Sequence, residues 1–219
     1  LYELDLRLRP SGNKGPVATH IESFRKYQRQ DAWTWEQMAL SRARPIAGDP
    51  GLCDELRAEV AAILALPRDA AKVRREAFDM RNLIEEEKPP RDLWDIKLIP
   101  GGLIDLEFIA QVAVITGQFD GSPGTTGTAD VLAHLSSGYA DGQMRQELGD
   151  AYAFYLAVTQ MTRLCLTGAF DRNDVPPGLS DLLLAATDLP DFSVLEAHLK
   201  DVSTGVRKSF DQLFRTKRK

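Results

Sequence analysis

The first ten residues, LYELDLRLRP, place chemically useful side chains at a regular spacing of two. Alternate side chains of an extended strand point to opposite faces, so three leucines share one face: Leu4, Leu6 and Leu8. The other face carries Asp5, Arg7 and Arg9. A carboxylate beside two guanidiniums can hold a divalent cation while the arginines bind phosphate oxygens. A solvated strand with a ladder of charges has the same pattern, and the pattern alone favours that alternative.

Two further segments contain residues that could bind an anion. In AWTWEQMALSRAR (residues 32–44), Arg42 and Arg44 come at the end of an expected helix, where the helix dipole favours cations. Arg42 is a candidate nucleotide-binding residue, although core packing and dipole compensation also explain this segment. In DIKLIPGGLIDLEF (residues 95–108), the Gly-Gly pair precedes a helix and could let a backbone N–H approach a phosphate. Most such pairs are tight turns, so the pair alone does not identify a site.

Hydrophobic periodicity predicts that these segments are positioned by helices. Asp49 with Pro50, and Asp69, are expected to begin two of them, because Asp caps a helix start and Pro suits the first turn. LWDIKLI (residues 93–99) is expected to be a short strand. The fold class is therefore mainly α, with a small β remnant at the N-terminal end. Further helices are expected over residues 19–30, 32–44, 103–117, 129–135 and 143–168, with two more after them.

Composition indicates a globular protein of 219 residues with a formal net charge of −5. Residues 1–44 carry eight Lys and Arg against five Asp and Glu, so a basic segment opens an acidic chain. This distribution favours a local anion site over a nucleic-acid surface. No apolar run reaches membrane-spanning length, so no membrane segment is expected. Cys53 and Cys165 are expected to be free thiols in a cytoplasmic protein, and three scattered histidines suggest neither a triad nor a metal cluster: His20, His134 and His198.

Taken together, the motifs resemble one family. YELDLRLRPSG, AWTWEQMALSRAR and DIKLIPGGLIDLEFIAQ, in this order and at these spacings, are similar to the adenylyltransferase that modifies bacterial glutamine synthetase. The resemblance covers residues 1–118, and beyond it only the helical character agrees. The family has two related transferase halves, and PSG with AWTWE resembles the C-terminal half, which attaches AMP. Because the chain begins without Met inside a strand pattern, we expect a segment truncated on its N-terminal side.

The resemblance implies a polymerase-β-like nucleotidyltransferase with ATP as substrate and Mg²⁺ as cofactor. Three carboxylates surround two Mg²⁺ ions in that superfamily, and Asp5 occupies the position of the third. Asp5 would bind metal and help a tyrosine hydroxyl of glutamine synthetase to lose its proton. Arg7 and Arg9 would bind the triphosphate or an acidic target loop, or else pair structurally with Asp5. The Gly-Ser loop and Asp-x-Asp pair that supply the other carboxylates are absent before Asp5, so the chain alone is expected to be inactive.

The helical part resembles the uridylyltransferase that modifies the PII signal protein, through Lys97, Gly101, Gly102 and Asp105. Lys97 is a candidate phosphate ligand, and a salt bridge explains it equally well. Asp105 is expected to stabilise a helix start rather than to contact nucleotide. If this segment is helical, Asp105 and Glu107 point to different faces and cannot serve one site.

The expected organisation is the end of a nucleotidyltransferase domain at residues 1–47 and a helical, uridylyltransferase-like domain at residues 48–219. Glutamine synthetase and the PII signal protein are the implied partners, and neither nucleic acid nor membrane is expected. One alternative remains open, a non-catalytic helical module that binds glutamine synthetase or PII. A Gly-Ser loop and an Asp-x-Asp pair upstream of Leu1 would favour the enzyme.

Overall fold

The protein is described by a computed structural model that covers residues 15–121 and 127–215. Within these residues the prediction of a mainly α fold is confirmed, and extended backbone pairs only at an isolated antiparallel bridge between Phe119 and Leu135. The expected β remnant at residues 1–10 lies outside the described residues. The helices are α1 (Ile21–Gln30), α2 (Thr34–Leu40), α3 (Pro50–Leu64), α4 (Ala70–Glu87), α5 (Leu103–Ile115), α6 (Thr128–Ala133), α7 (Gly142–Cys165), α8 (Pro177–Thr187) and α9 (Phe192–Phe214).

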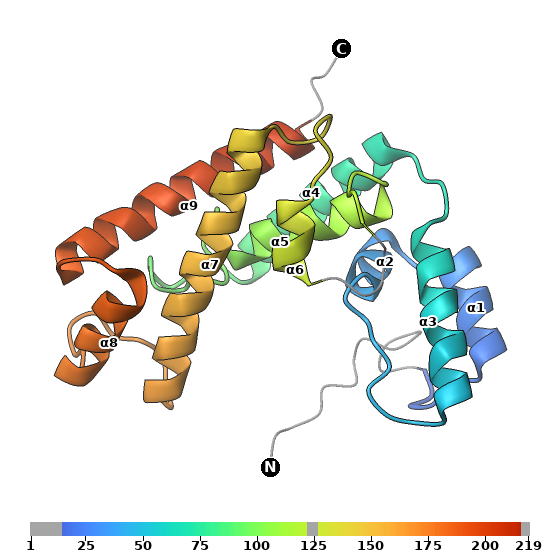
Figure 1. Ribbon diagram of the computed structural model, residues 1–219, viewed down its shortest axis with the longest axis horizontal. Helices are drawn as coiled ribbons and strands as arrows, with labels where there is room; N and C mark the ends of the chain where they lie inside the picture. Colours follow the sequence, from blue (N-terminus) through green and yellow to red (C-terminus); the bar gives the residue numbers. More distant parts are fainter. Residues whose placement is uncertain (1–14, 122–126, 216–219) are drawn as a thin grey trace.

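Helix α5 is the centre of the molecule (Figure 1), with α1 to α3 towards one end and α8 at the other. It contacts α2, α4, α6, α7 and α9. Its sequence, LIDLEFIAQVAVI, is apolar around almost the whole helix, which is typical of a helix buried on all sides. Leu106, Ile109 and Val112 are completely buried. Each such side chain contributes about 1.5–3 kcal/mol of hydrophobic stabilisation, so α5 organises the core.

Aspartates fix the beginnings of four helices. The predicted caps Asp49 and Asp69 are confirmed, since the Asp49 carboxylate accepts the N–H of Leu52 at 3.0 Å and Asp69 accepts the N–H of Ala71 at 2.9 Å. Asp141 and Asp191 cap α7 and α9 in the same way. Each cap pairs amide groups that have no partner inside their own helix.

The expected strand at residues 93–99 is wrong, because this segment forms consecutive turns. Asp92 accepts the N–H of Trp94 at 2.8 Å, and the Asp95 carbonyl accepts the N–H of Leu98 at 2.8 Å. Ile96 and Ile99 are the buried residues, at a spacing of three rather than two. Local hydrogen bonds therefore take the place of the ladder that a strand would need.

Helix α9 is held near both of its ends by aromatic contacts. Phe192 stacks on Trp94 of the turn segment with ring centroids 5.2 Å apart. Phe210 stacks on Phe78 of α4 at 6.2 Å. Helix α9, which lies far away in sequence, thus joins α4 to the turn segment that follows it.

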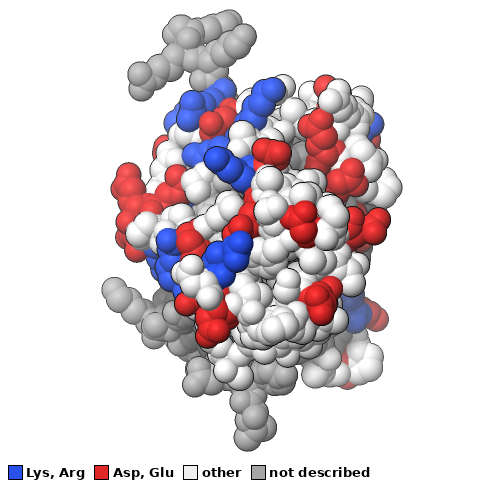
Figure 2. All heavy atoms as spheres, turned by 90° about the vertical axis from the view of Figure 1, so that its left-hand side faces the viewer, with Lys and Arg blue, Asp and Glu red and all other residues white. Residues whose placement is uncertain are grey.

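The face over α7, α8 and α9 carries Asp and Glu side chains among uncharged ones, with Lys and Arg mainly towards one edge (Figure 2). In the described part of the chain, no helix combines the length and apolar character needed to cross a membrane.

Candidate functional site

A cavity of about 650 Å³ lies between α1, α2 and α3. This volume falls within the range of small-molecule pockets, about 300–1,000 Å³. Its polar lining residues are Thr19, Gln28, Glu36, Arg42 and Arg44. Its apolar walls come from all three helices and include Ile21, Phe24, Leu40, Leu52, Leu56 and Val60.

The AWTWE motif builds the start of α2 beside this cavity. Trp33 donates its backbone N–H to Glu36 Oε2 at 2.9 Å, and the Tyr27 hydroxyl donates to Glu36 Oε1 at 2.8 Å. Both carboxylate oxygens of Glu36 are therefore used to cap α2 and to tie it to α1. Glu36 has a structural role here.

Gln28 is the buried polar residue of the cavity wall. It is 6% exposed, and its side-chain Oε1 has no hydrogen-bond partner. Its backbone carbonyl accepts from Gln37 Nε2 at 3.1 Å, so the backbone of Gln28 is satisfied while its side-chain oxygen is not. A buried acceptor without a donor destabilises a protein by about 1–3 kcal/mol.

Arg42 lines the same cavity, just beyond the end of α2 at Leu40. Its guanidinium lies 2.8 Å from the carboxylate of Glu107 on α5. The helix is shorter than the expected 32–44, so Arg42 and Arg44 follow the helix end rather than completing it. A phosphate bound by Arg42 would share the guanidinium with Glu107.

A second groove, of about 540 Å³, runs between α2 and α4. Trp35 lines both this groove and the cavity, so the two hollows are neighbours that share one residue. Exposed apolar side chains border the groove, with Trp33 70% and Leu83 44% exposed.

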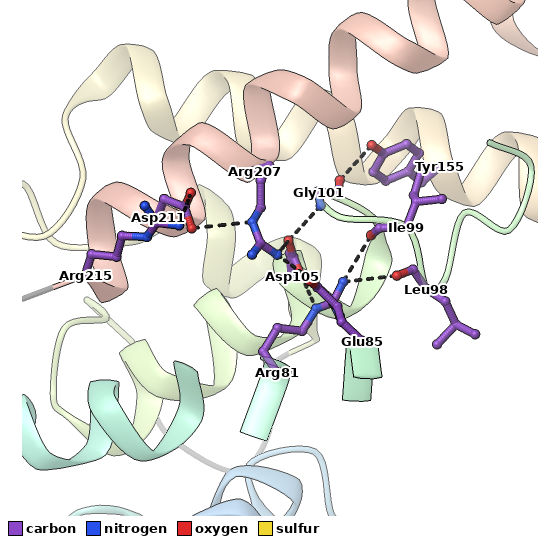
Figure 3. Close-up of polar contacts among 10 residues, drawn as sticks. All are labelled: Arg81, Glu85, Leu98, Ile99, Gly101, Asp105, Tyr155, Arg207, Asp211 and Arg215. Carbon is purple, nitrogen blue, oxygen red and sulfur yellow. Dashed lines mark hydrogen bonds and ion pairs between the residues drawn. The ribbon is translucent and has the colours of Figure 1, made fainter. Parts of the chain in front are cut away.

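The Gly-Gly segment belongs to a buried charge cluster between α4, α5 and α9 (Figure 3). Asp105 is completely buried and pairs with Arg81 Nε, while its other oxygen accepts the N–H of Gly101 at 2.7 Å. Arg81 also donates to the carbonyls of Leu98 and Ile99, at 3.1 and 3.2 Å. The turn, α4 and α5 are therefore fastened together by one ion pair.

Helix α9 joins this cluster through Arg207. Arg207 Nη1 contacts Glu85 and lies 3.4 Å from Asp105 Oδ2, and Glu85 also lies 3.1 Å from Arg81 Nη1. Burial raises the pKa of the Asp105 carboxyl, and the two guanidiniums and the Gly101 N–H oppose that rise. Asp211 lies 3.4 Å from Arg207 Nε and 3.3 Å from Arg215, so the network in Figure 3 contains three cations and three anions.

The two glycines are required by close backbone approach. Gly101 has a φ of +79°, and a Cβ there would lie 1.8 Å from the carbonyl oxygen of Ser203 on α9. A Cβ on Gly102 would lie 2.2 Å from the Ile96 carbonyl oxygen. The Gly101 carbonyl accepts the Tyr155 hydroxyl of α7 at 2.8 Å. The Gly-Gly pair thus packs the turn against α9 and α7, and the Gly101 N–H is used by Asp105.

The predicted site residues fall into three places. Arg42 lines the cavity, and Lys97 is exposed in the turn segment and is not among the described residues that line it. The remaining predicted residues lie outside the described residues: Asp5, Arg7 and Arg9. Asp105 and Glu107 point to different faces of α5, as expected, since one contacts Arg81 and the other Arg42.

Arg81 and Arg207 were not predicted, although a signal for Arg81 exists. Val73, Ala77 and Arg81 follow one another at a spacing of four, so a charged residue falls on the buried stripe of α4. Asp105 inside the most apolar helix is the matching anion. A buried charge requires an opposite charge, so the pair could have been inferred from these two positions.

Over residues 15–121 and 127–215, no three His, Cys, Asp or Glu side chains come together as a metal site. The predicted metal ligand Asp5 lies outside the described residues.

Comparisons with known proteins extend over the entire chain. Residues 1–59 match the model of the glutamate-ammonia ligase adenylyltransferase family, and residues 78–169 match that of the GlnD PII-uridylyltransferase family. A bifunctional glutamine synthetase adenylyltransferase/adenylyl-removing enzyme from Mesorhizobium japonicum is 75% identical over 218 residues, which is 100% of this chain and 22% of that protein. Proteins of the same name from Brucella suis and Agrobacterium fabrum are 50% and 51% identical, over 97% and 96% of the chain. The chain spans about a fifth of the length of these relatives, 22% in each.

Proposed function

Because this chain is related over its whole length to one segment of the glutamine synthetase adenylyltransferases, we propose that it is part of an ATP-dependent enzyme that transfers AMP to glutamine synthetase. The relationship confirms the resemblance inferred from the motifs and extends it beyond residue 118. The single observation that carries the proposal is the identity with the Mesorhizobium protein along the entire chain.

The proposed reaction is a displacement at the α-phosphorus of ATP. A tyrosine hydroxyl oxygen of glutamine synthetase forms the new bond to phosphorus, the bond to pyrophosphate breaks, and the hydroxyl proton is released. Asp5 is the proposed catalytic carboxylate and Mg²⁺ ligand, and Arg7 and Arg9 are the proposed ligands of the triphosphate or of an acidic target loop. These residues belong to the half of the enzyme that attaches AMP.

Arg42 and Lys97 are the proposed phosphate-binding residues of the described part. Arg42 is supported by its place on the cavity, with a side chain that is 48% exposed and a guanidinium that contacts Glu107. Lys97 is supported by its exposure on the turn held by Arg81 and Asp105. The buried cluster would keep that turn in place while its surface residues contact a ligand.

The helical domain proposed from residue 48 onward would contact regulators. Its match to the PII-uridylyltransferase family covers α5, α6 and α7 completely and the C-terminal half of α4. We propose the PII signal protein as a partner of this part. If the residues before Leu1 lacked the remaining carboxylates, binding of PII or glutamine synthetase would be its whole function.

The experiment uses a full-length adenylyltransferase that carries this segment, with glutamine synthetase, ATP and Mg²⁺. Mass spectrometry of glutamine synthetase measures attached AMP. We expect Asp5→Asn to reduce transfer by about 100-fold or more, because a catalytic carboxylate is lost. Removal of AMP from modified glutamine synthetase should continue, since Asp5 is assigned to the attaching half.

Asp54→Asn is the matched control, because Asp54 is a highly exposed carboxylate on α3. It should leave both activities unchanged. Near-normal transfer by the Asp5 variant would overturn the assignment. The 219-residue chain is expected to transfer no AMP by itself, because it contains no Asp-x-Asp pair.

A further inference from the structure

We propose that the groove between α2 and α4 is the docking site for a basic amphipathic helix of a separate partner protein. The apolar side of that helix would lie on the groove, and its Lys and Arg side chains would meet the carboxylates along the groove. This interaction surface does not depend on the assignment of Asp5 as a catalytic residue.

Large apolar side chains line the groove and remain exposed. Trp33 and Trp35 come from the start of α2, and Leu83 comes from α4. Met80, which is half-buried, lines the groove beside them. Tryptophan and methionine are enriched where proteins bind one another, and exposed apolar groups gathered in one place mark such surfaces. The groove is therefore suited to the apolar side of a partner.

The two walls of the groove are held together within the described chain. The Thr34 hydroxyl of α2 donates to the Glu76 carboxylate of α4. The lining residues of α4 run from Lys72 to Leu83, which is about 16 Å along the helix axis. A groove of this kind between two helices accommodates a third helix, and a preformed groove lowers the cost of binding.

The charges along the groove are mainly negative. Asp31, Glu76 and Asp79 line it, and Lys72 is the single cation among its described lining residues. Lys72 lies 3.8 Å from Glu76, whereas Asp31 and Asp79 form no ion pair with any described residue. One unpaired carboxylate thus comes from the segment before α2 and the other from α4. Lys and Arg side chains of a partner would complement them.

The acidic character continues beyond the groove along α4. Glu86 and Glu87 come three and four residues after Leu83, so they lie on the same side of the helix. Both are exposed, and neither forms an ion pair with a described residue. The helix dipole disfavours anions at the C-terminal end, so these carboxylates do not stabilise α4. A cationic partner would remove this unfavourable interaction, which favours a basic helix over a neutral or acidic one.

A synthetic peptide tests the docking site on a full-length adenylyltransferase that carries this segment. The peptide has roughly 18 residues, with leucines along one helical face and lysines on the other. Fluorescence anisotropy of a label on the peptide measures binding. One control peptide has glutamates in place of the lysines, and another has the same composition with its leucines spread around the helix. We expect the basic amphipathic peptide to bind about ten-fold more tightly than either control, and absent or equal binding would overturn the proposal.

Matched substitutions locate the binding. Leu83→Ala and Leu182→Ala each remove an exposed leucine, 44% and 47% exposed, but Leu182 lies on α8, away from the groove (Figure 1). Asp79→Lys and Asp181→Lys each reverse an exposed carboxylate, one on α4 and one on α8. The α4 variants should weaken binding by about ten-fold, and the α8 variants should change it by less than about two-fold. Equal effects on the two helices would show non-specific attraction and would overturn the proposal.

Circular dichroism checks that each variant is folded. Asp79→Lys changes an exposed side chain, so the test does not depend on the Leu83 variant alone.

Two other occupants are distinguished by further measurements. If another part of the same enzyme covered the groove, the peptide would bind the 219-residue chain but not the full-length protein. If a second copy covered it, sedimentation would show a dimer that Asp79→Lys dissociates. Either result would overturn the proposal. AMP transfer by the Asp5 variant is measured separately and bears only on the proposed function.

Discussion

Arg81 and Asp105 form an ion pair in which both side chains are completely buried, one on α4 and the other on α5. The pair also holds the Gly101 turn through the N–H of Gly101 and the carbonyls of Leu98 and Ile99. The Gly-Gly segment suggested phosphate binding from its sequence. In the structure it instead takes part in the contacts that join the turn to α4 and α5.

Asp105→Asn should strongly destabilise the fold, because it leaves the buried Arg81 without its main anionic partner. Removing one member of a buried ion pair typically lowers the free energy of unfolding by about 3–5 kcal/mol. Urea unfolding followed by circular dichroism measures the change. Asp54→Asn, which removes an exposed carboxylate paired with Arg57, should change the free energy of unfolding by less than about 0.5 kcal/mol. Equal effects of the two substitutions would contradict the role of Asp105.

Gly101→Ala should be much more harmful than Gly117→Ala. Both glycines have a positive φ, +79° and +66°, so both substitutions introduce backbone strain of about 1–2 kcal/mol. A Cβ at Gly101 also collides with the backbone of α9, whereas nothing lies within 4 Å of one at Gly117. The free energy of unfolding of the Gly101→Ala variant should therefore fall by about 3 kcal/mol or more. Thermal and urea unfolding of the two variants, compared side by side, measure the difference; equal losses would show that α9 does not approach Gly101 closely.

Tyr155→Phe should lower the free energy of unfolding by about 1 kcal/mol or somewhat more, because the buried Gly101 carbonyl loses the hydroxyl that donates to it. The aromatic ring and its packing are kept. The control is Tyr152→Phe, because Tyr152 is a half-buried tyrosine on the same helix. Its free energy of unfolding should be close to that of the unchanged protein. The free energies of unfolding of both variants give the comparison, and an unchanged value for Tyr155→Phe would rule out a useful hydrogen bond.

Stability should fall in acid partly through the Asp69 cap. Hydrogen bonds from the backbone N–H groups of Lys72 and Ala71 lower the pKa of this carboxyl in the folded state. At low pH the unfolded chain therefore binds more protons than the folded protein does. The stabilisation is present above the unfolded pKa, about 3.9, and is lost as pH falls through the lower folded pKa. Asp69→Asn keeps an oxygen that can accept these bonds but does not titrate, so its urea midpoint should depend less steeply on pH below about 4. Identical pH profiles for the two proteins would contradict this contribution.

Local signals in the sequence predicted most of the helices. Asp49 and Asp69 could be identified as caps because capping is local: each side chain accepts from an amide only two or three residues later in the chain. Residues 103–115 could be identified as a buried helix because almost every position is apolar. Such features depend on neighbouring residues alone.

Contacts between distant segments were harder to predict. Residues 93–99 alternate well enough to suggest a strand, but their backbone groups bond within turns that rest on α9 and α5. The place of Arg207 beside Asp105 depends on how α9 crosses the molecule, which no local pattern encodes. Arg42 was predicted to lie at the C-terminal end of a helix, but α2 ends at Leu40, and the partner of Arg42, Glu107, comes from another helix.

The crossing of α9 also bears on how the protein is made. Helix α9 ends at Phe214, yet it supplies Arg207 to Asp105 and Phe210 to Phe78. While a ribosome is still synthesising residues before 192, α4 and α5 therefore exist without these partners. The core can close only after the last helix has emerged, so completion of folding is postponed to the end of this segment's translation.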